Sequence, residues 1–180
     1  MVSLQEKYKK EVVPEMSKKF GYSNAMAVPR ITKAVVNVGT GRLSRDKGGD
    51  EEIVKHLTAI TGQRPVPCAA HISIASFKTR QGQVIGRKVT LRGKRMYDFL
   101  QRLVSSALPR TRDFRGLEPK SVDHGGNLTI GIREHIIFPE TIGEDTRFIF
   151  GLEVTATTNS KSREEALELF RLVGFPIKKS

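Results

Sequence analysis

Residues 84–107 read VIGRKVTLRGKRMYDFLQRLVSSA and pass from a strand pattern into a helix pattern. The first nine residues alternate, with Ile85, Val89 and Leu91 on one side and Lys88, Thr90 and Arg92 on the other, which predicts a β-strand. From 94 to 107 the apolar residues follow the helical repeat, at Met96, Phe99, Leu100, Leu103 and Ala107. This stretch indicates a helix that packs against a sheet.

The same two patterns recur on both sides of this stretch. Helices are predicted over 4–20, 50–61 and the segment that starts with the capping box of Ser162 and Glu165. Strands are predicted over 31–38, 128–133 and 148–158, and 63–83 has no clear period and is predicted to be a long loop or arm. Four amphipathic helices and about four strands predict an α+β fold. We expect a single two-layer domain over residues 1–180, with a largely antiparallel sheet and helices on one face.

Positive charge is concentrated in the middle of the chain. Residues 77–120 hold twelve of the 31 lysines and arginines against only three acidic residues, and the whole chain has a net charge of +12. Because apolar residues recur at regular spacing through this segment, the charge is displayed on folded structure. A folded basic surface most often binds a polyanion, and the usual polyanion is nucleic acid.

Each predicted strand has one polar side, which we call the open face. Its predicted members are small polar and basic residues: Lys33, Asn37, Lys88, Thr90, Arg92, Thr129, Arg133, Thr155 and Thr157. Such side chains can contact a sugar-phosphate backbone closely. The alternative is an ordinary solvated sheet face, and the adjacent basic segment favours RNA binding.

The sequence offers no candidate for catalysis or metal binding. Cys68 is the only cysteine, the four histidines lack metal-ligand spacing, and no arrangement suits nucleophilic or acid–base chemistry. The Gly39-Thr40-Gly41 turn does not complete a dinucleotide-binding pattern. We therefore expect no enzyme activity, no cofactor and no metal. The N-terminal residues are unlike a signal peptide, and no segment approaches the roughly 20 apolar residues of a membrane-spanning helix, so no membrane partner is expected.

Two loops could bind RNA. FKTRQG at 77–82 combines an aromatic residue, cations, an amide and a glycine, which suits stacking on single-stranded RNA, although an ordinary hairpin tip fits equally. RTRDFRG at 110–116 places Arg110, Arg112 and Arg115 around Asp113. In one interpretation Asp113 holds one arginine while the others bind phosphate; in the other, the four residues form an internal salt-bridge network.

Many short stretches of the chain resemble the bacterial-type ribosomal protein L5 family. They occur in family order and cover nearly the whole chain: EVVPE at 11–15, FGY at 20–22, VPR at 28–30, VNVGTG at 36–41, TGQRP at 61–65, FKTRQG at 77–82, IG at 85–86, KVTLRGKRM at 88–96, LPRTRDFRG at 108–116, IRE at 132–134, IIFPE at 136–140 and GFP at 174–176. KVTLRG and RDFRGL together make the resemblance specific.

The resemblance implies a structural, non-enzymatic constituent of the large ribosomal subunit that binds 5S rRNA and helps seat it in the central protuberance. The family's contact positions match Asn37, Gln63, Thr90 and Arg92. The complete set expected to bind RNA is Arg30, Lys33, Asn37, Gln63, Lys88, Thr90, Arg92, Arg110, Arg112 and Arg115.

The resemblance also implies further partners. A protruding arm at about 70–86 reaches toward the tRNA in the peptidyl site, and its expected tRNA-proximal residues are Ser73, Phe77, Lys78, Arg80 and Gln81. Large-subunit rRNA and a protein in the head of the small subunit, across an intersubunit bridge, are the other expected partners. The implied location is the cytoplasmic ribosome, with an organellar ribosome as the other possibility.

The chain departs from the family pattern in three places, at 70–73, at Val84 and at 122–127, where a usual glycine is His124. Two other functions remain as alternatives. A generic basic RNA- or DNA-binding module outside the ribosome would account for the charge, and a small basic enzyme acting on RNA would need a site that the sequence does not offer.

Overall fold

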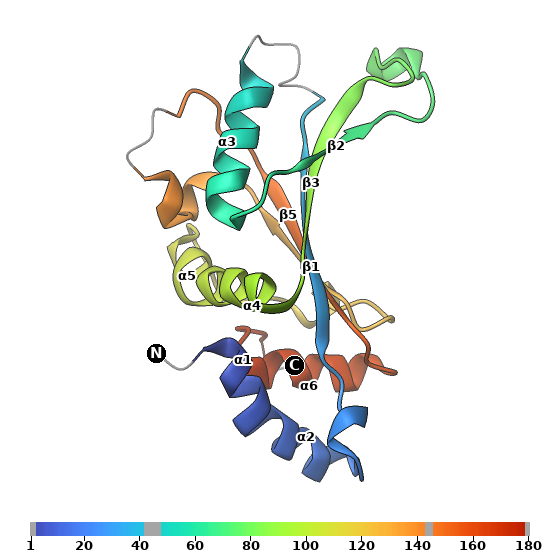
Figure 1. Ribbon diagram of the computed structural model, residues 1–180, viewed down its shortest axis with the longest axis vertical. Helices are drawn as coiled ribbons and strands as arrows, with labels where there is room; N and C mark the ends of the chain where they lie inside the picture. Colours follow the sequence, from blue (N-terminus) through green and yellow to red (C-terminus); the bar gives the residue numbers. More distant parts are fainter. Residues whose placement is uncertain (1–2, 42–47, 143–145, 179–180) are drawn as a thin grey trace. The chain divides into compact units, whose positions relative to one another are not determined.

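The structure is a computed structural model that describes residues 3–41, 48–142 and 146–178. A five-stranded antiparallel sheet has the strand order β2-β3-β1-β5-β4 (Figure 1), so the predicted α+β class is confirmed. The strands are β1 (Ile31–Gly39), β2 (Val66–Ala69), β3 (Val84–Leu91), β4 (Leu128–Ile132) and β5 (Leu152–Thr158). The α-helices are α1 (Leu4–Lys7), α2 (Val13–Phe20), α3 (Gly49–Thr61), α4 (Gly93–Arg102), α5 (Leu108–Arg110) and α6 (Arg163–Val173).

The chain divides into two compact units. Unit 1 comprises residues 1–34, 91–130 and 155–180, and unit 2 comprises residues 35–90 and 131–154. The single-domain organisation over 1–180 stays a prediction. None of the helices in the described residues is both long and apolar enough to cross a membrane.

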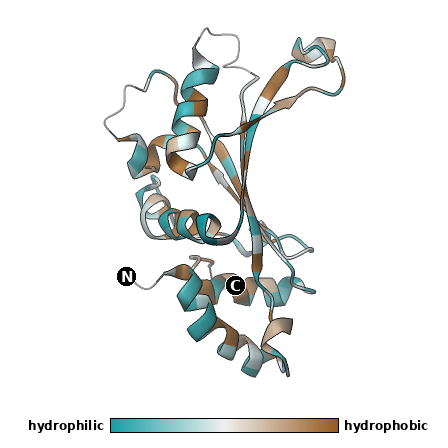
Figure 2. Ribbon diagram, in the orientation of Figure 1, coloured by the Kyte–Doolittle hydropathy of each residue, from teal (hydrophilic) through white to brown (hydrophobic). Residues whose placement is uncertain are grey.

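Unit 1 is built on the apolar faces of its helices. Helix α1 packs against α4, and α2 packs against α6. The predicted stripe of α4 is confirmed, because Met96, Phe99 and Leu100 are buried. Figure 2 shows hydrophobic and hydrophilic residues on the same helices, as expected for elements with one buried side.

Helix α6 begins and ends as its sequence predicts. The Ser162 hydroxyl accepts a hydrogen bond from the Glu165 amide, and the Glu165 carboxylate accepts one from the Lys161 amide. Gly174 ends the helix in the left-handed conformation, with φ of 117°. These contacts satisfy backbone groups that a helix end would leave without partners.

Both long helical segments of unit 1 widen just before a proline. A π-helical turn at Tyr8–Val12 precedes Pro14, and a second one at Leu103–Ala107 precedes Pro109. Proline has no amide hydrogen, and its ring clashes with the carbonyl four residues earlier in a regular α-helix. The wider turn accommodates the ring, so the predicted helix over 4–20 continues past Pro14, and the one over 94–107 continues to Arg110.

Unit 2 places α3 on one side of its strands (Figure 1). Ile53, Leu57 and Ile60 of α3 are fully buried, and the helix packs against the short 3-10 turn Pro139–Thr141. Gly62 ends α3 with φ of 69°, as predicted. The helix predicted over 50–61 is therefore confirmed within one residue. Residues 42–47, which follow the Gly39-Thr40-Gly41 turn, lie outside the described residues.

Two predictions differ from the structure: part of the loop predicted over 63–83 is a strand, and the strand predicted over 148–158 is shorter. The predicted loop over 63–83 contains β2, an edge strand that pairs antiparallel with β3 and includes Pro67 opposite Arg87. An edge strand tolerates proline because the missing amide faces away from the ladder, and this short strand shows no alternation. The strand predicted from 148 begins only at Leu152; at Gly151, just before it, a Cβ atom would lie 3.1 Å from the Ile132 carbonyl oxygen and 3.2 Å from that of Arg133, so the chain packs tightly there.

Candidate nucleic-acid interface

The open face of unit 2 has the composition that alternation predicts. Asn37 of β1 and Lys88 of β3 are exposed, while Val36, Val38 and Val89 are buried on the opposite side. Thr90 is half-buried next to Lys88. Strands β1 and β3 are neighbours in the sheet. Asn37, Lys88 and Thr90 therefore lie on adjacent strands and can be reached from solvent, while Arg133, also exposed, follows β4 at the far edge of the sheet.

Gln63 is held against this face by the turn that follows α3. Its Nε2 donates a hydrogen bond to the Thr90 carbonyl at 3.4 Å. The Thr61 hydroxyl lies 2.6 Å from the Leu57 carbonyl oxygen and 3.0 Å from that of Gln63, and its single proton is placed between these two acceptors, which fixes the turn. Although Gln63 and Thr90 are far apart in sequence, the structure brings these two predicted residues together.

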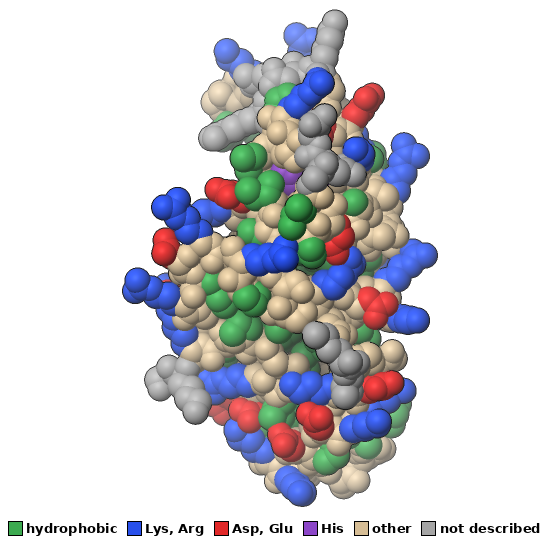
Figure 3. All heavy atoms as spheres, turned by 90° about the vertical axis from the view of Figure 1, so that its left-hand side faces the viewer, with side chains coloured by type: hydrophobic (Ala, Val, Ile, Leu, Met, Phe, Trp, Pro, Cys, Tyr) green, Lys and Arg blue, Asp and Glu red, His purple; other side chains and the backbone are tan. Residues whose placement is uncertain are grey.

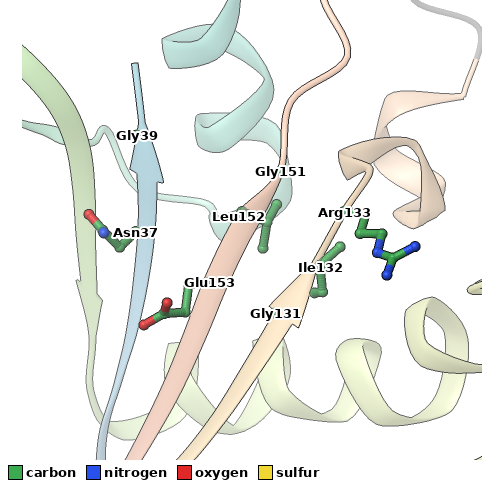
Figure 4. Close-up of a pocket in the computed structure, with 8 residues that line it drawn as sticks. All are labelled: Asn37, Gly39, Gly131, Ile132, Arg133, Gly151, Leu152 and Glu153. Atoms are coloured by element: carbon green, nitrogen blue, oxygen red, sulfur yellow. The ribbon is translucent and has the colours of Figure 1, made fainter. Parts of the chain in front are cut away.

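A shallow hollow of about 430 Å³ lies on β1 and on the next two strands of the sheet, β5 and β4 (Figure 4). Its lining includes Gly39, Gly131 and Gly151, together with Asn37 and Glu153. Asn37 and Glu153 project from neighbouring strands β1 and β5 (Figure 4). Because the glycines carry no side chains, backbone atoms of the strands are accessible here.

In unit 1 the open-face prediction holds except at the start of β1. Lys33 is half-buried and Arg30 is exposed. Alternation with Lys33 and Asn37 would place Ile31 on the open face and Thr32 on the opposite side, but Ile31 is buried and Thr32 is exposed. The regular alternation of β1 therefore begins after Thr32. Arg92 is exposed at the N-cap position of α4.

Most cations of the central basic segment make no ion pair or hydrogen bond through their side chains with any described residue. Nine of them are also exposed: Lys78, Arg80, Lys88, Arg92, Lys94, Arg95, Arg110, Arg112 and Arg115. On the side of the molecule shown in Figure 3, basic side chains lie among acidic and hydrophobic ones. The unpaired cations are the groups best suited to bind phosphate.

Like Lys120, which pairs with Glu118, Arg87 is one of the paired cations in this segment. Its Nε donates to Asp50 at 2.9 Å and its second guanidinium nitrogen makes a further contact with the same carboxylate. The hydrogen bonds to Asp50 raise the pKa of Arg87 above its ordinary value. This bidentate pair explains how an arginine is accommodated where alternation predicts an apolar residue.

Both interpretations of the 110–116 loop pair Asp113 with an arginine, and for the described residues that pairing is wrong. Asp113 pairs with none of Arg110, Arg112 and Arg115, all of which are exposed. Asp113 instead adopts a left-handed backbone with φ of 55°, which aspartate tolerates better than most residues. The three arginines are therefore left available for an anionic partner.

The arm has an internally hydrogen-bonded tip. The amides and carbonyls of Ile74 and Thr79 pair reciprocally at 3.1 and 3.2 Å around a 3-10 turn, and Lys78 has φ of 52°. The Ser73 hydroxyl accepts a hydrogen bond from the Gln81 amide at 2.9 Å. Phe77 is 69% exposed. The five predicted arm residues, Ser73, Phe77, Lys78, Arg80 and Gln81, are all exposed.

Unit 2 contains a pair of buried histidines that the sequence does not predict. The His56 and His135 rings lie 4.8 Å apart, and His135 stacks on Phe150 at 4.0 Å. Burial, and then the neighbouring His56, lower the pKa of His135 to about 4. Nothing in the sequence pairs the two histidines, since they come from α3 and from a distant 3-10 turn. The described residues contain no cluster of ligands that could hold a metal ion.

Two family models and several curated relatives match the sequence of this chain. The family model described as "Ribosomal protein L5" matches residues 24–80, and a second model, which describes the C-terminus of the same ribosomal family, matches residues 84–177. Large ribosomal subunit protein uL5 of Halothermothrix orenii is 52% identical over 98% of both chains. The uL5 proteins of Colwellia psychrerythraea and Dictyoglomus turgidum are 50% and 49% identical, each over 99% of this chain and 99% and 100% of their own lengths.

The matched segments include the strands and loops that carry the exposed polar and basic residues described above. The similarity to these relatives extends over nearly their full length, so it is not confined to a few motifs. The chain therefore belongs to the ribosomal protein L5 family, uL5, and is a structural, non-enzymatic constituent of the large ribosomal subunit.

Proposed function

We propose that this protein binds 5S rRNA and helps seat it in the central protuberance of the large subunit. Family membership establishes association with the ribosome and its rRNA, in a cytoplasmic location. Our proposal goes further and names 5S rRNA as the partner. The observation that carries the proposal is the group of Asn37, Gln63 and Thr90 in unit 2. The hydrogen bond from Gln63 to the Thr90 carbonyl holds the Gln63 side chain against β3 before any RNA binds.

Cations supply the affinity in this proposal. Lys88, Arg92 and Arg110 are exposed and unpaired among the described residues, and so are Arg30, Arg112 and Arg115; Lys33 is half-buried. Phosphate contacts of such residues position RNA, while polar side chains on the strands read its shape and its exposed 2′-hydroxyls and bases. Binding should therefore combine a strong electrostatic contribution with selectivity for one folded RNA.

The test is binding to transcribed 5S rRNA across a salt series, with tRNA and duplex DNA as competitors. Arg92→Ala should cost about 1–3 kcal/mol of binding free energy, the range for a charge-assisted hydrogen bond. Lys18→Ala is the control, because Lys18 is an exposed cation of α2 outside the proposed set. Equal binding to all three nucleic acids, or no effect of Arg92→Ala, would favour a generic basic module instead.

We also propose that the arm contacts the tRNA in the peptidyl site. Its support is the exposed Phe77 beside the exposed cations Lys78 and Arg80, on a tip that its own hydrogen bonds hold in shape. Base stacking on an aromatic ring contributes about 1–3 kcal/mol. Phe77→Ala should reduce photocross-linking to tRNA in reconstituted ribosomes while 5S rRNA binding is retained; unchanged cross-linking would contradict the assignment.

An intersubunit bridge to a protein of the small-subunit head completes the proposal. Its support is the family membership alone, and its residues on this chain are left unassigned. Cross-linking of reconstituted ribosomes followed by mass spectrometry would identify them.

A further inference from the structure

A second polar hollow lies in unit 1. It has a volume of about 310 Å³ and is lined by Gln5, Tyr8, Lys9, Arg30, Ile31, Thr32, Gly93, Met96 and Tyr97. These residues come from the N-terminal helical segment, the start of β1 and the start of α4. The volume is at the lower end of the range for small-molecule sites, which suits a single nucleotide.

The hollow combines aromatic rings with cations and lacks opposing charge. Its lining contains two tyrosines, one lysine and one arginine, and no acidic residue among those described. Lys9 and Arg30 are exposed, and neither side chain makes an ion pair or hydrogen bond with another described residue. Two cations without carboxylate partners favour an anionic ligand.

The backbone and one ring of the site are fixed in advance. The Tyr8 hydroxyl donates a hydrogen bond to the Pro29 carbonyl at 3.0 Å. The Arg30 amide donates to Asn159 Oδ1 at 2.7 Å, and the Asn159 amide donates to the Arg30 carbonyl at 3.3 Å. These bonds hold Arg30 by its backbone alone, so its guanidinium remains available to a ligand.

The two phenol groups remain protonated at neutral pH. Burial raises the pKa of Tyr8 and of Tyr97, and Arg30 opposes that rise in both. The Tyr97 hydroxyl makes no hydrogen bond with any described residue. It can therefore donate to a phosphate or a base, while the rings and the planar guanidinium offer surfaces for stacking.

A further hollow of about 330 Å³ adjoins this one, because it shares Tyr8, Lys9 and Arg30. It adds apolar contacts from Val13, Met26 and Val28, and Met26 is 79% exposed. The three shared residues thus lie between two cavities, one flanked by Tyr97 and one by an exposed methionine. This arrangement provides room for consecutive nucleotides of a single strand.

We infer that the hollow at Tyr8, Arg30 and Tyr97 binds an unstacked nucleotide of single-stranded or looped rRNA, with its base against the rings and its phosphate near Lys9 and Arg30. The inference rests on the RNA-binding function proposed above and extends the contact proposed there for Arg30 to Tyr8, Lys9 and Tyr97. An acidic peptide is the competing occupant; the tyrosine rings and the ribosomal family of the chain favour a nucleotide.

Tyrosine fluorescence provides a direct test. The chain has three tyrosines and no tryptophan, and two of the three line the hollow. In the full-length Tyr22→Phe protein, which removes the third tyrosine, pentamers of uridylate and of adenylate should quench the emission saturably. Arg30→Gln and Lys9→Gln should each raise the dissociation constant by at least about fivefold, because each variant loses one charge-assisted contact to the phosphate.

The matched control is Lys10→Gln, which removes the same charge from the adjacent exposed lysine outside the hollow. It should leave the constant unchanged within error. Absence of quenching, an equal effect of Lys10→Gln, or stronger quenching by an octaglutamate peptide would each overturn the inference. Binding of 5S rRNA separates the two proposals. If the protein binds 5S rRNA and Arg92→Ala weakens that binding, but the oligonucleotides do not quench the tyrosine emission, then the hollow is not a nucleotide site and the proposed function still holds.

Discussion

At the scale of single residues, the buried histidines are the least expected feature. His135 is fully buried, and its Nδ1 accepts a hydrogen bond from the Phe150 amide at 3.4 Å. Glu52 accepts hydrogen bonds from the amides of Arg147 and Phe148, and its Oε1 lies 3.6 Å from His56 Nε2. These contacts join α3 to the segment that precedes β5. Sequence reasoning could not pair residues so far apart without a recognised ligand spacing.

Because of this cluster, the free energy of unfolding should depend on pH in the acidic range. The pKa of His135 is lowered to about 4 from 6.5, first by burial and then by His56. Between these values the unfolded chain binds a proton that the folded protein does not. The free energy of unfolding should therefore fall as the pH drops from 6.5 toward 4, by at most about 1.4 kcal/mol per pH unit from this residue.

Urea unfolding at several pH values checks this prediction. His135→Gln removes the titrating group while an amide oxygen can still accept from Phe150, so its stability should vary less steeply over the window. His124→Gln is the control, because His124 is exposed. Identical pH profiles for the wild type and His135→Gln would show that His135 does not titrate as its surroundings indicate.

At the scale of elements, the 122–127 turn shows how the chain tolerates His124 in place of a usual glycine. The only left-handed residue of this turn is Gly126, with φ of 76°. Asp123 fixes the turn by accepting from the Asn127 amide at 2.7 Å and from its side chain at 2.9 Å. His124 therefore occupies a position that any residue can adopt, and the departure from the family pattern needs no rebuilt turn.

Gly126→Ala should destabilise the protein by about 2–4 kcal/mol, because strain and overpacking add. A Cβ atom here would collide with the Ser160 hydroxyl and lie 3.0 Å from Thr158 Oγ1 and 3.1 Å from Ala166 Cβ. Gly131→Ala is the matched control, since nothing lies within 4 Å of its Cβ position and its φ is not positive. Chemical denaturation should show a large loss for the first variant and less than about 0.5 kcal/mol for the second.

The N-cap of α6 gives a smaller prediction of the same kind. Ser162→Ala removes the acceptor for the Glu165 amide and should cost about 1 kcal/mol of unfolding free energy. Ser23→Ala, at an exposed position outside any helix, should be close to neutral. A denaturation midpoint unchanged by Ser162→Ala would mean that water satisfies the helix end equally well.

Elements with strong periodicity could be predicted, and those defined by distant contacts could not. The stripes of α4 and α6 are buried as predicted because each helix has one apolar side. Strand β2 has four residues and a proline, so only its pairing with β3 identifies it. Likewise, the residues before Leu152 look like a strand in sequence, but the close approach of Gly151 to β4 carbonyls is visible only in three dimensions.

At the scale of the whole molecule, the distribution of charge is the property that the sequence predicts best. The basic segment was located from composition alone, and nine of its cations prove exposed and unpaired among the described residues. Composition could not show that Arg87 is neutralised by Asp50, or that Gln63 is bound to Thr90. The sequence therefore predicts which residue types of the candidate site lie on strands. The contacts that hold these residues in place are visible only in the folded structure.

This distribution makes a quantitative prediction for RNA binding. Each phosphate contact releases counterions, so the logarithm of the 5S rRNA binding constant should fall linearly with the logarithm of salt concentration. Lys88→Gln should reduce the magnitude of that slope by about one, because one cation–phosphate contact is lost. Thr90→Ala removes no charge and should weaken binding at every salt concentration while the slope is kept. If both variants shift the lines in parallel, Lys88 does not contact phosphate, and the open face of unit 2 binds RNA through its polar residues alone.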